Sequence, residues 1–259
     1  MVYWILLQKS FMRNLQYKVA HLINNAASAI FGFVFIAIWA GVLQGKEQNS
    51  PYDVMDMTYY IAAAQCILWV SGFLTAGLNI QNGVRNGAIS LELVRPTNFF
   101  LYVTSQEAGR LVYNFFFRSV PIGLVFAITV GFYVPQNVLS YLFICISILL
   151  AIIISVNLHY LVGISACWTT EVAWAHFVNF TLLAGLGGQM VPIDFLPAPL
   201  SVLTQYLPFA GAIYYPVMVF LEKASHDVIW IQLFWAIALT LLNLWITERA
   251  RQKLEIQGG

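Results

Sequence analysis

Long apolar stretches dominate the sequence, and short polar segments separate them. The stretches are continuous and do not alternate between polar and apolar positions, so they predict membrane-spanning helices and not the strands of a β-barrel. A run of about 20 apolar residues crosses the hydrocarbon core of a bilayer. Six stretches meet this requirement, at residues 20–43, 57–78, 101–132, 138–167, 172–190 and 228–247.

The first residues predict an amphipathic helix that lies in the membrane interface. Over residues 3–18, Trp4, Leu7 and Phe11 recur at helical spacing, and basic side chains occupy other parts of the helical wheel. A cleaved signal peptide is the alternative. The next apolar run, residues 20–43, is too long for a signal sequence, and no small-residue cleavage site closes it. We therefore expect this run to be the first transmembrane helix.

A polar segment at residues 79–98, which we call the polar island, follows the second expected span. Gly83 and Gly87 loosen its backbone, and Pro96 ends any helix that forms across residues 88–94. Its charged side chains are Arg85, Glu92 and Arg95. This pattern predicts a cytoplasmic loop on which a soluble partner acts.

A proline-rich segment at residues 191–221 lies between the fifth and sixth expected spans. A continuous spanning helix there would lose backbone hydrogen bonds repeatedly, so we expect short half-helices that re-enter the bilayer from outside. Five of the nine prolines are in this segment, at Pro192, Pro197, Pro199, Pro208 and Pro216.

The distribution of basic residues orients the expected spans. Cytoplasmic segments of membrane proteins are enriched in Lys and Arg. With six spans, nine basic residues share the cytoplasmic face with both termini: Lys9, Arg13, Lys18, Arg85, Arg95, Arg110, Arg249, Arg251 and Lys253. A seventh span through residues 200–221 would move the last three outside, which this tendency disfavours.

Composition supports one polytopic, all-α transmembrane domain over residues 1–259. The chain is 60% hydrophobic and 9% charged, which excludes an ordinary soluble core. Its net charge of +1 gives no general attraction to nucleic acid. Cys66, Cys145 and Cys167 fall in apolar segments at unrelated spacings, which favours small buried side chains over a disulfide framework or a metal site.

One short segment is partly similar to a phosphate-binding loop. Residues 41–47 read GVLQGKE, whereas the motif needs four residues between its glycines and a Ser or Thr after the Lys. Three residues separate the glycines here, and Glu47 follows the Lys. We therefore expect no nucleotide site, no cofactor and no enzymatic activity in this chain. Any ATP and Mg²⁺ would be bound by another polypeptide.

The third expected span carries a polar stripe, formed by Glu107, Arg110, Asn114 and Arg118 at spacings of three or four residues. Arg118 would lie about 12 Å deeper in the membrane than Arg110, at about 1.5 Å per residue. A charge at mid-bilayer costs about 2.5–3.5 kcal/mol on insertion scales, so Arg118 needs a partner, a snorkelled pose or a polar cavity. We favour a structural or conformational pairing, with direct substrate contact as the alternative.

Polar residues also occur in the fourth and fifth expected spans. Asn157 and His159, with His176 and Asn179, predict hydrogen bonds between packed helices. A proton path or a catalytic centre is the alternative, although no motif such as H-E-x-x-H accompanies these residues. Glu171 lies in the turn between the two spans, where a cytoplasmic partner could reach it.

Three segments together resemble a known family. They are GAISLELVRPTNFF at 87–100, ACWTTEVAW at 166–174 and GQMVPIDFLPAPLSVLTQYLPF at 188–209. Their order is similar to that in the membrane subunit of type-2 ATP-binding-cassette exporters, in the small six-helix branch, and the resemblance covers nearly the whole chain. Leu196 stands where that family usually has a second Phe.

The resemblance implies a permease in the bacterial cytoplasmic membrane, paired with a second permease that is identical or homologous to it. Two copies of an ATPase would dock on residues 82–95, the coupling helix, while residues 192–221 would form the re-entrant outer segment. The expected ATPase-coupling residues are Arg85, Glu92, Arg95 and Glu171. A hydrophobic or amphipathic cargo, such as a drug, a peptide antibiotic or a lipid, would be exported along Trp69, Phe73, Phe177, Phe180 and Leu183.

Two other classes of function stay open. A channel or secondary transporter would work without an ATPase and usually contains inverted repeats, of which we find no convincing trace. An intramembrane enzyme would use His159, His176 or Glu171, and it requires these side chains to converge in one cavity.

Overall fold

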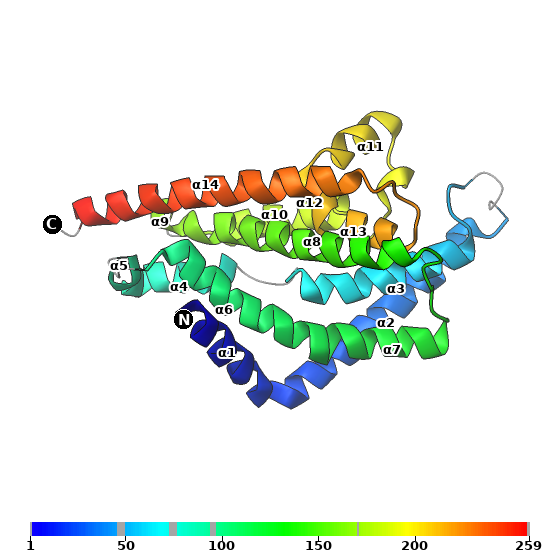
Figure 1. The fold of residues 1–259 in the computed structure, drawn as a ribbon, viewed down its shortest axis with the longest axis horizontal. Coiled ribbons are helices and arrows are strands. Elements are labelled where there is room, and N and C mark those ends of the chain that lie inside the picture. The colour runs from blue at the N-terminus through cyan, green and yellow to red at the C-terminus, as the bar shows by residue number, and fades with distance from the viewer. Residues whose placement is uncertain (1, 46–49, 73–76, 94–96, 170, 258–259) are drawn as a thin grey trace.

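The computed structural model describes residues 2–45, 50–72, 77–93, 97–169 and 171–257. It is 83% helical and contains no strand within these residues, which confirms the all-α prediction for this part of the chain. Figure 1 shows both termini at the same end of the molecule as α4 and α5, and α11 near the other end. This arrangement places the two helices of the polar island at the same end of the molecule as the two termini.

The N-terminal helix folds back on the rest of the molecule (Figure 1). Helix α1 (Val2–Asn14) joins α2 (Lys18–Leu43) through the 3-10 turn η1 (Leu15–Tyr17). One face of α1 packs against α6, with Ser10 only 4% exposed. Trp4 and Met12 remain 61% and 66% exposed, as a helix lying at a membrane surface requires.

The second apolar stretch forms a shorter helix than expected. Helix α3 spans Val54–Val70, within and just before the predicted 57–78 segment. It starts early because the Asp53 carboxylate caps it by accepting from the Asp56 backbone N–H at 2.6 Å. It ends at Val70 because Gly72 adopts φ +69°, a left-handed conformation that glycine tolerates best.

The polar island folds into two short helices. The 3-10 turn η3 (Gly77–Asn79) leads into α4 (Ile80–Arg85), and α5 (Ala88–Leu93) follows a turn at Gly87. Gly87 has φ +74°, so this glycine provides the loosening that the sequence predicted. The last part of the predicted coupling helix, with Arg95, and the helix-ending Pro96 lie outside the described residues.

The third expected span is a long helix with a local irregularity. Helix α6 (Phe99–Asn114) passes through a π-helical turn, η4 (Phe115–Ser119), into α7 (Val120–Thr129). Pro121 lacks a backbone N–H, which explains why regular α-helical hydrogen bonding is interrupted just before it. Helix α7 ends at Thr129, before the predicted end of the span at 132. Gly131, with φ +95°, follows soon after.

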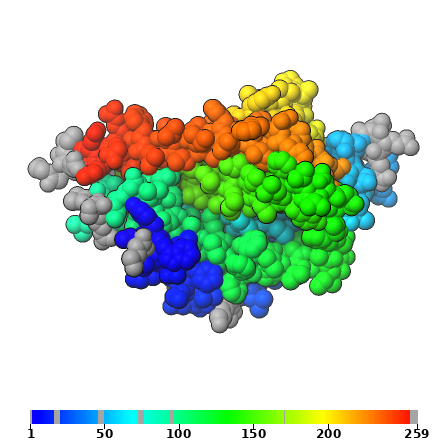
Figure 2. All heavy atoms as spheres, viewed as in Figure 1, coloured from blue at the N-terminus to red at the C-terminus, as the bar shows by residue number. Residues whose placement is uncertain are grey.

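Two long helices form the other side of the bundle. Helix α8 (Val138–Ile164) packs along α14 (Val228–Gln257), which continues ten residues beyond its predicted end. Asn243 donates to the Asn157 side-chain oxygen at 2.6 Å, a hydrogen bond between fully buried side chains. Figure 2 shows α14 along one edge of the molecule and α1 at the opposite edge.

The chain between α8 and α14 consists of short helices. A turn with α9 (Ala166–Thr169) leads to α10 (Ala173–Leu186). The proline-rich segment then forms η5 (Ile193–Phe195), α11 (Ala198–Gln205), α12 (Pro208–Ala212) and α13 (Tyr214–Phe220). Proline is tolerated in the first helical turn, so the prolines of this segment fit where its helices start.

Four helices of the described chain are long and apolar enough to cross a membrane. They span His21–Leu43, Phe99–Thr129, Val138–Thr169 and Val228–Lys253. Helices α3 and α10 are apolar but shorter, with 17 and 14 residues. The expected count of six spans therefore depends on these two helices and stays a prediction.

A carboxylate fastens the turn after α13 to the start of α8. Glu222 has φ +55°, and its side chain accepts hydrogen bonds from Ser140 Oγ at 2.6 Å and from the Gln136 and Asn137 backbone N–H groups at 2.8 and 3.0 Å. Tyr133 Oη donates a fourth at 3.1 Å. These bonds favour the charged carboxylate and lower the pKa of Glu222 to about 2. The hydrogen bond from Ser140 has the largest effect.

The lowered pKa predicts a specific acid sensitivity. In the unfolded chain Glu222 takes up its proton near pH 4.5, whereas in the folded protein it does so near pH 2. Its contribution to stability is therefore complete above pH 4.5 and is lost as the pH falls towards 2. Thermal unfolding between pH 6 and pH 3 should show a smaller acid-induced decrease for Glu222→Gln than for the wild type, and Ser140→Ala should lie between them. Equal decreases in all three would contradict this role.

Candidate functional site

The two cytoplasmic segments predicted from the sequence meet in one cluster. Arg85, at the end of α4, forms an ion pair with Glu171, in the turn before α10. Gln81 Nε2 donates to Glu171 Oε1 at 3.0 Å, and the Ala173 backbone N–H donates to the same oxygen at 3.1 Å. The Ala173 and Gln81 hydrogen bonds, and then the Arg85 charge, lower the pKa of Glu171. We call Gln81, Arg85 and Glu171 the coupling cluster.

The coupling cluster lies at the surface, where it connects two segments but contributes little to stability. The side chains of Arg85 and Glu171 are 54% and 55% exposed. Exposed ion pairs contribute little to stability, because water and salt screen them. Their effect is to connect the polar island to the first turn of α10.

Helix α5 has an exposed surface next to the coupling cluster. Ile89 and Leu93, four residues apart, are buried among Phe99, Phe100 and other apolar side chains. Leu91 points the other way and is 74% exposed. Glu92 is half-buried and lines a cavity between α5, α1 and α6, while Arg95 lies outside the described residues.

The 3-10 turn η3, which leads into the polar island, lies directly against α8. Gly77, two residues before the polar island, lies in close contact with Gly163 of α8. A β-carbon at Gly163 would lie 2.1 Å from the Gly77 carbonyl oxygen, which is far inside van der Waals contact. Neither position has room for a side chain, so η3 and α8 are in contact through their backbones.

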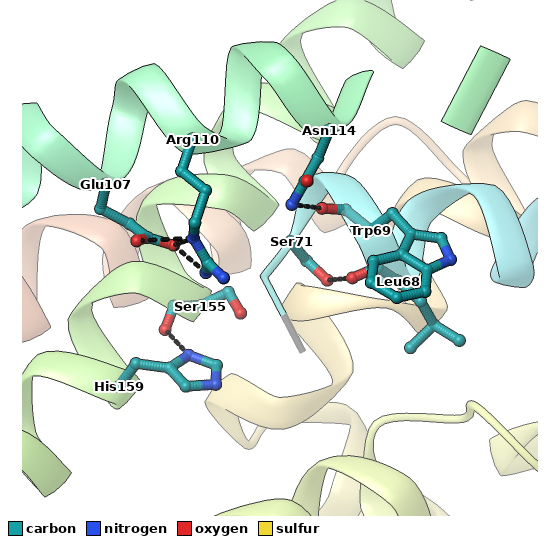
Figure 3. A network of polar contacts seen from close by, with 8 residues as sticks. All are labelled: Leu68, Trp69, Ser71, Glu107, Arg110, Asn114, Ser155 and His159. Carbon is teal, nitrogen blue, oxygen red and sulfur yellow. Dashed lines mark hydrogen bonds and ion pairs between the residues drawn. The ribbon is translucent and has the colours of Figure 1, made fainter. Parts of the chain in front are cut away.

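The first three residues of the polar stripe are held within the bundle (Figure 3). The Glu107 carboxylate is 8% exposed and pairs with Arg110, whose Nε lies 3.0 and 3.1 Å from the two carboxylate oxygens. Asn114 Nδ2 donates to the Trp69 carbonyl oxygen at 3.1 Å, which connects α6 to the end of α3.

Arg118 lies in the π-helical turn and is 8% exposed. Its guanidinium carbon is 4.1 Å from the centroid of the Trp69 ring, a cation–π contact, and its Nη2 donates to His21 Nδ1. His21 Nε2 lies 3.1 Å from the Asn14 carbonyl oxygen, so it must donate there, and this pair of bonds fixes the neutral ring. The sequence predicted the need for a partner but did not identify His21, which lies 97 residues away.

The expected pathway residues separate into different environments. Trp69 and Phe180 line one cavity of about 320 Å³ between α2, α3 and α10. Leu183 is 1% exposed and belongs to the apolar core, whereas Phe177 is 68% exposed. Phe73 lies outside the described residues.

Several polar groups interrupt the apolar wall of this cavity, which we call the pathway cavity. Trp69 Nε1 donates to Ser28 Oγ at 3.0 Å, and Ser28 Oγ donates to Gln65 Oε1 at 3.1 Å. Gln189 is 8% exposed, and its Oε1 has no hydrogen-bond partner among the described residues. An apolar cavity with a few amides and hydroxyls suits an amphipathic molecule.

The residues of the alternative catalytic centre lie in different surroundings. His159 Nδ1 donates to the Ser155 carbonyl oxygen of its own helix at 2.6 Å (Figure 3), while Glu171 belongs to the exposed coupling cluster. Neither His159, His176 nor Glu171 lines the pathway cavity or the cavity beside Glu92. These contacts give no support to an intramembrane active site.

Comparison with known proteins assigns the chain to a family. No curated protein matches it. A family model described as ABC-2 family transporter protein matches residues 22–258, which is nearly the whole chain. This match confirms the resemblance inferred from the three sequence segments. The chain therefore belongs to the ABC-2 transporter family, as a membrane-embedded transport subunit.

Proposed function

We propose that this chain is the permease subunit of an ATP-driven exporter of hydrophobic or amphipathic molecules. Membership of the family implies association with an ATPase subunit. In the proposed assembly, two ATPase copies bind ATP and Mg²⁺, and a second permease, identical or homologous, completes the pathway. The permease has six spans and lies in the bacterial cytoplasmic membrane with both termini in the cytoplasm.

The observation that carries this proposal is the ion pair between Arg85 and Glu171. It joins the polar island, where an ATPase would dock, to the start of α10, which contributes Phe180 to the pathway cavity. Closure of the ATPases would push on α4 and α5, and the coupling cluster would transmit the push to α10. A rigid-body shift of packed helices is an established mode of such switching.

The pathway cavity supports an amphipathic cargo. Its aromatic and aliphatic walls would contact the apolar part of the molecule, and Gln65 and Gln189 would bond its polar groups. Burying an amide without a partner is costly, so the unpartnered oxygen of Gln189 favours a ligand with a hydrogen-bond donor. The proline-rich helices α11 to α13 would close the outer end of the pathway.

A charge-swap experiment tests this coupling. The permease and its ATPase are reconstituted in inside-out vesicles, and ATP hydrolysis and uptake of a hydrophobic dye into the vesicle lumen are both measured. Arg85→Glu and Glu171→Arg should each uncouple hydrolysis from dye uptake, because each places like charges side by side. The double variant restores opposite charges and should recover uptake.

Arg249→Glu is the matched control, because Arg249 is an exposed arginine on α14 that stacks on Trp245 outside the coupling cluster. It should leave coupling intact. Normal uptake in both single variants would contradict the coupling role, and ATP-dependent loss of dye from the lumen would contradict the direction of export.

A further inference from the structure

We propose that the cavity between α1, the polar island and α6 binds the headgroup of a zwitterionic phospholipid that carries a primary ammonium, such as phosphatidylethanolamine. The lipid would come from the leaflet that faces α4 and α5. This site is separate from the pathway cavity and from the exposed surface of α5. We call it the headgroup cavity.

The walls of the headgroup cavity come from α1, α6 and the segment from η3 to α5. Its volume is about 520 Å³, larger than the pathway cavity. Helix α1 contributes Ser10 and Arg13, α5 contributes Glu92, and α6 contributes Glu107 and Arg110. A ligand in it would therefore contact both the amphipathic helix and the polar island.

The charges around the headgroup cavity are balanced. Glu107 and Arg110 pair with each other, which leaves Arg13 on α1 and Glu92 on α5 as one positive and one negative side chain. Among the described residues, neither of these two has an ion-pair partner. A purely anionic ligand would meet Glu92, and a purely cationic one would meet Arg13. A phosphate next to an ammonium satisfies both charges.

A buried hydroxyl gives the second indication of a ligand. Ser10 is 4% exposed and lines the headgroup cavity, and its Oγ has no hydrogen-bond partner among the described residues. Leaving a buried hydroxyl unpaired costs free energy. The site thus offers the Arg13 guanidinium to the phosphate.

The position of α1 favours a lipid as the source of the headgroup. Exposed Trp4 and Met12 place this helix at the level of the lipid headgroups. Apolar side chains, including Ile89, Phe99 and Val103, also line the cavity and could cover the glycerol end of a lipid. A soluble metabolite would gain nothing from these apolar contacts.

Native mass spectrometry of the purified full-length chain tests the proposal. The protein is titrated in detergent with phosphatidylethanolamine, phosphatidylcholine or phosphatidylglycerol of matched acyl chains, and retained lipid is counted. We expect the ethanolamine lipid to be retained preferentially, because its ammonium has three hydrogen-bond donors and the choline group has none. Equal retention of all three lipids would overturn the proposal, and preference for phosphatidylglycerol would show that positive charge alone attracts lipid.

Matched variants locate the binding. Arg13→Gln and Glu92→Gln should each weaken retention of the ethanolamine lipid about tenfold or more, the effect of removing one charge-assisted hydrogen bond. Lys9→Gln is the control for Arg13, because Lys9 is exposed on the same helix and does not line the headgroup cavity. If Lys9→Gln weakens retention as much as Arg13→Gln, the site is wrong. Soluble phosphoethanolamine that binds while no lipid is retained would overturn the lipid as the source.

Discussion

Replacing Gly163 by alanine is expected to push η3 and the start of the polar island away from α8 and to abolish transport. The added β-carbon would lie 2.1 Å from the Gly77 carbonyl oxygen and 2.9 Å from Cδ1 of Ile80. The first of these atoms is backbone, so no side-chain rotation can relieve the clash. Overpacking a tight interior site costs about 1–3 kcal/mol, and we expect the upper end of this range.

Two measurements check this result. Thermal unfolding of the purified permease should occur at a lower temperature, and ATP-driven dye uptake by the reconstituted complex should be lost. Gly41→Ala is the control, because a β-carbon at Gly41 meets nothing within 4 Å. Alanine is a better helix former than glycine by up to about 1 kcal/mol, so the control should be neutral or slightly stabilised. A Gly163→Ala permease that unfolds and transports like the control would contradict the close contact between η3 and α8.

The order of the elements could be predicted from sequence, because local chemistry determines it. A long apolar run, a polar segment with two glycines and a proline-rich segment are each recognised from residues that are neighbours in the sequence. Helix ends were less accurate where a single capping contact decides them. The Asp53 cap starts α3 three residues before the predicted segment, and the helix ends at Val70, just before the left-handed Gly72.

The partners within the site could not be predicted, because they depend on which helices pack together. Arg85 and Glu171 were both expected at the coupling surface, but they are 86 residues apart in the chain, and no local pattern indicates that they pair. Arg118 was expected to need a partner, and His21 supplies it only because α2 passes beside the π-helical turn. Glu92 was expected to contact the ATPase, and this stays a prediction; its side chain also lines the headgroup cavity.

The close contacts between backbones were missed for the same reason. A glycine within an apolar helix has no sequence signal that separates a tight crossing from open space. Gly109 and Gly163 lie at tight crossings, while Gly41 and Gly185 face open space. Only the position of the neighbouring helix distinguishes the two kinds of glycine.

Gly109→Ala is accordingly expected to release α1 from α6. A β-carbon there would lie 2.1 Å from the Leu7 carbonyl oxygen and 2.9 Å from Ser10 Cβ. Helix α6 is held by α3, α8 and α14, whereas α1 is a terminal helix of 13 residues, so α1 must be the element that moves.

Hydrogen exchange of the purified permease measures this release. Amides of α1 should exchange about tenfold faster or more, since each 1.4 kcal/mol lost from a local opening equilibrium is a factor of ten. Exchange in α14 should not change. Gly185→Ala is the control, because its β-carbon would meet open space within α10. Unchanged exchange in α1 would contradict the tight crossing. Faster exchange would also predict weaker retention of the ethanolamine lipid, because α1 supplies Ser10 and Arg13 to the headgroup cavity.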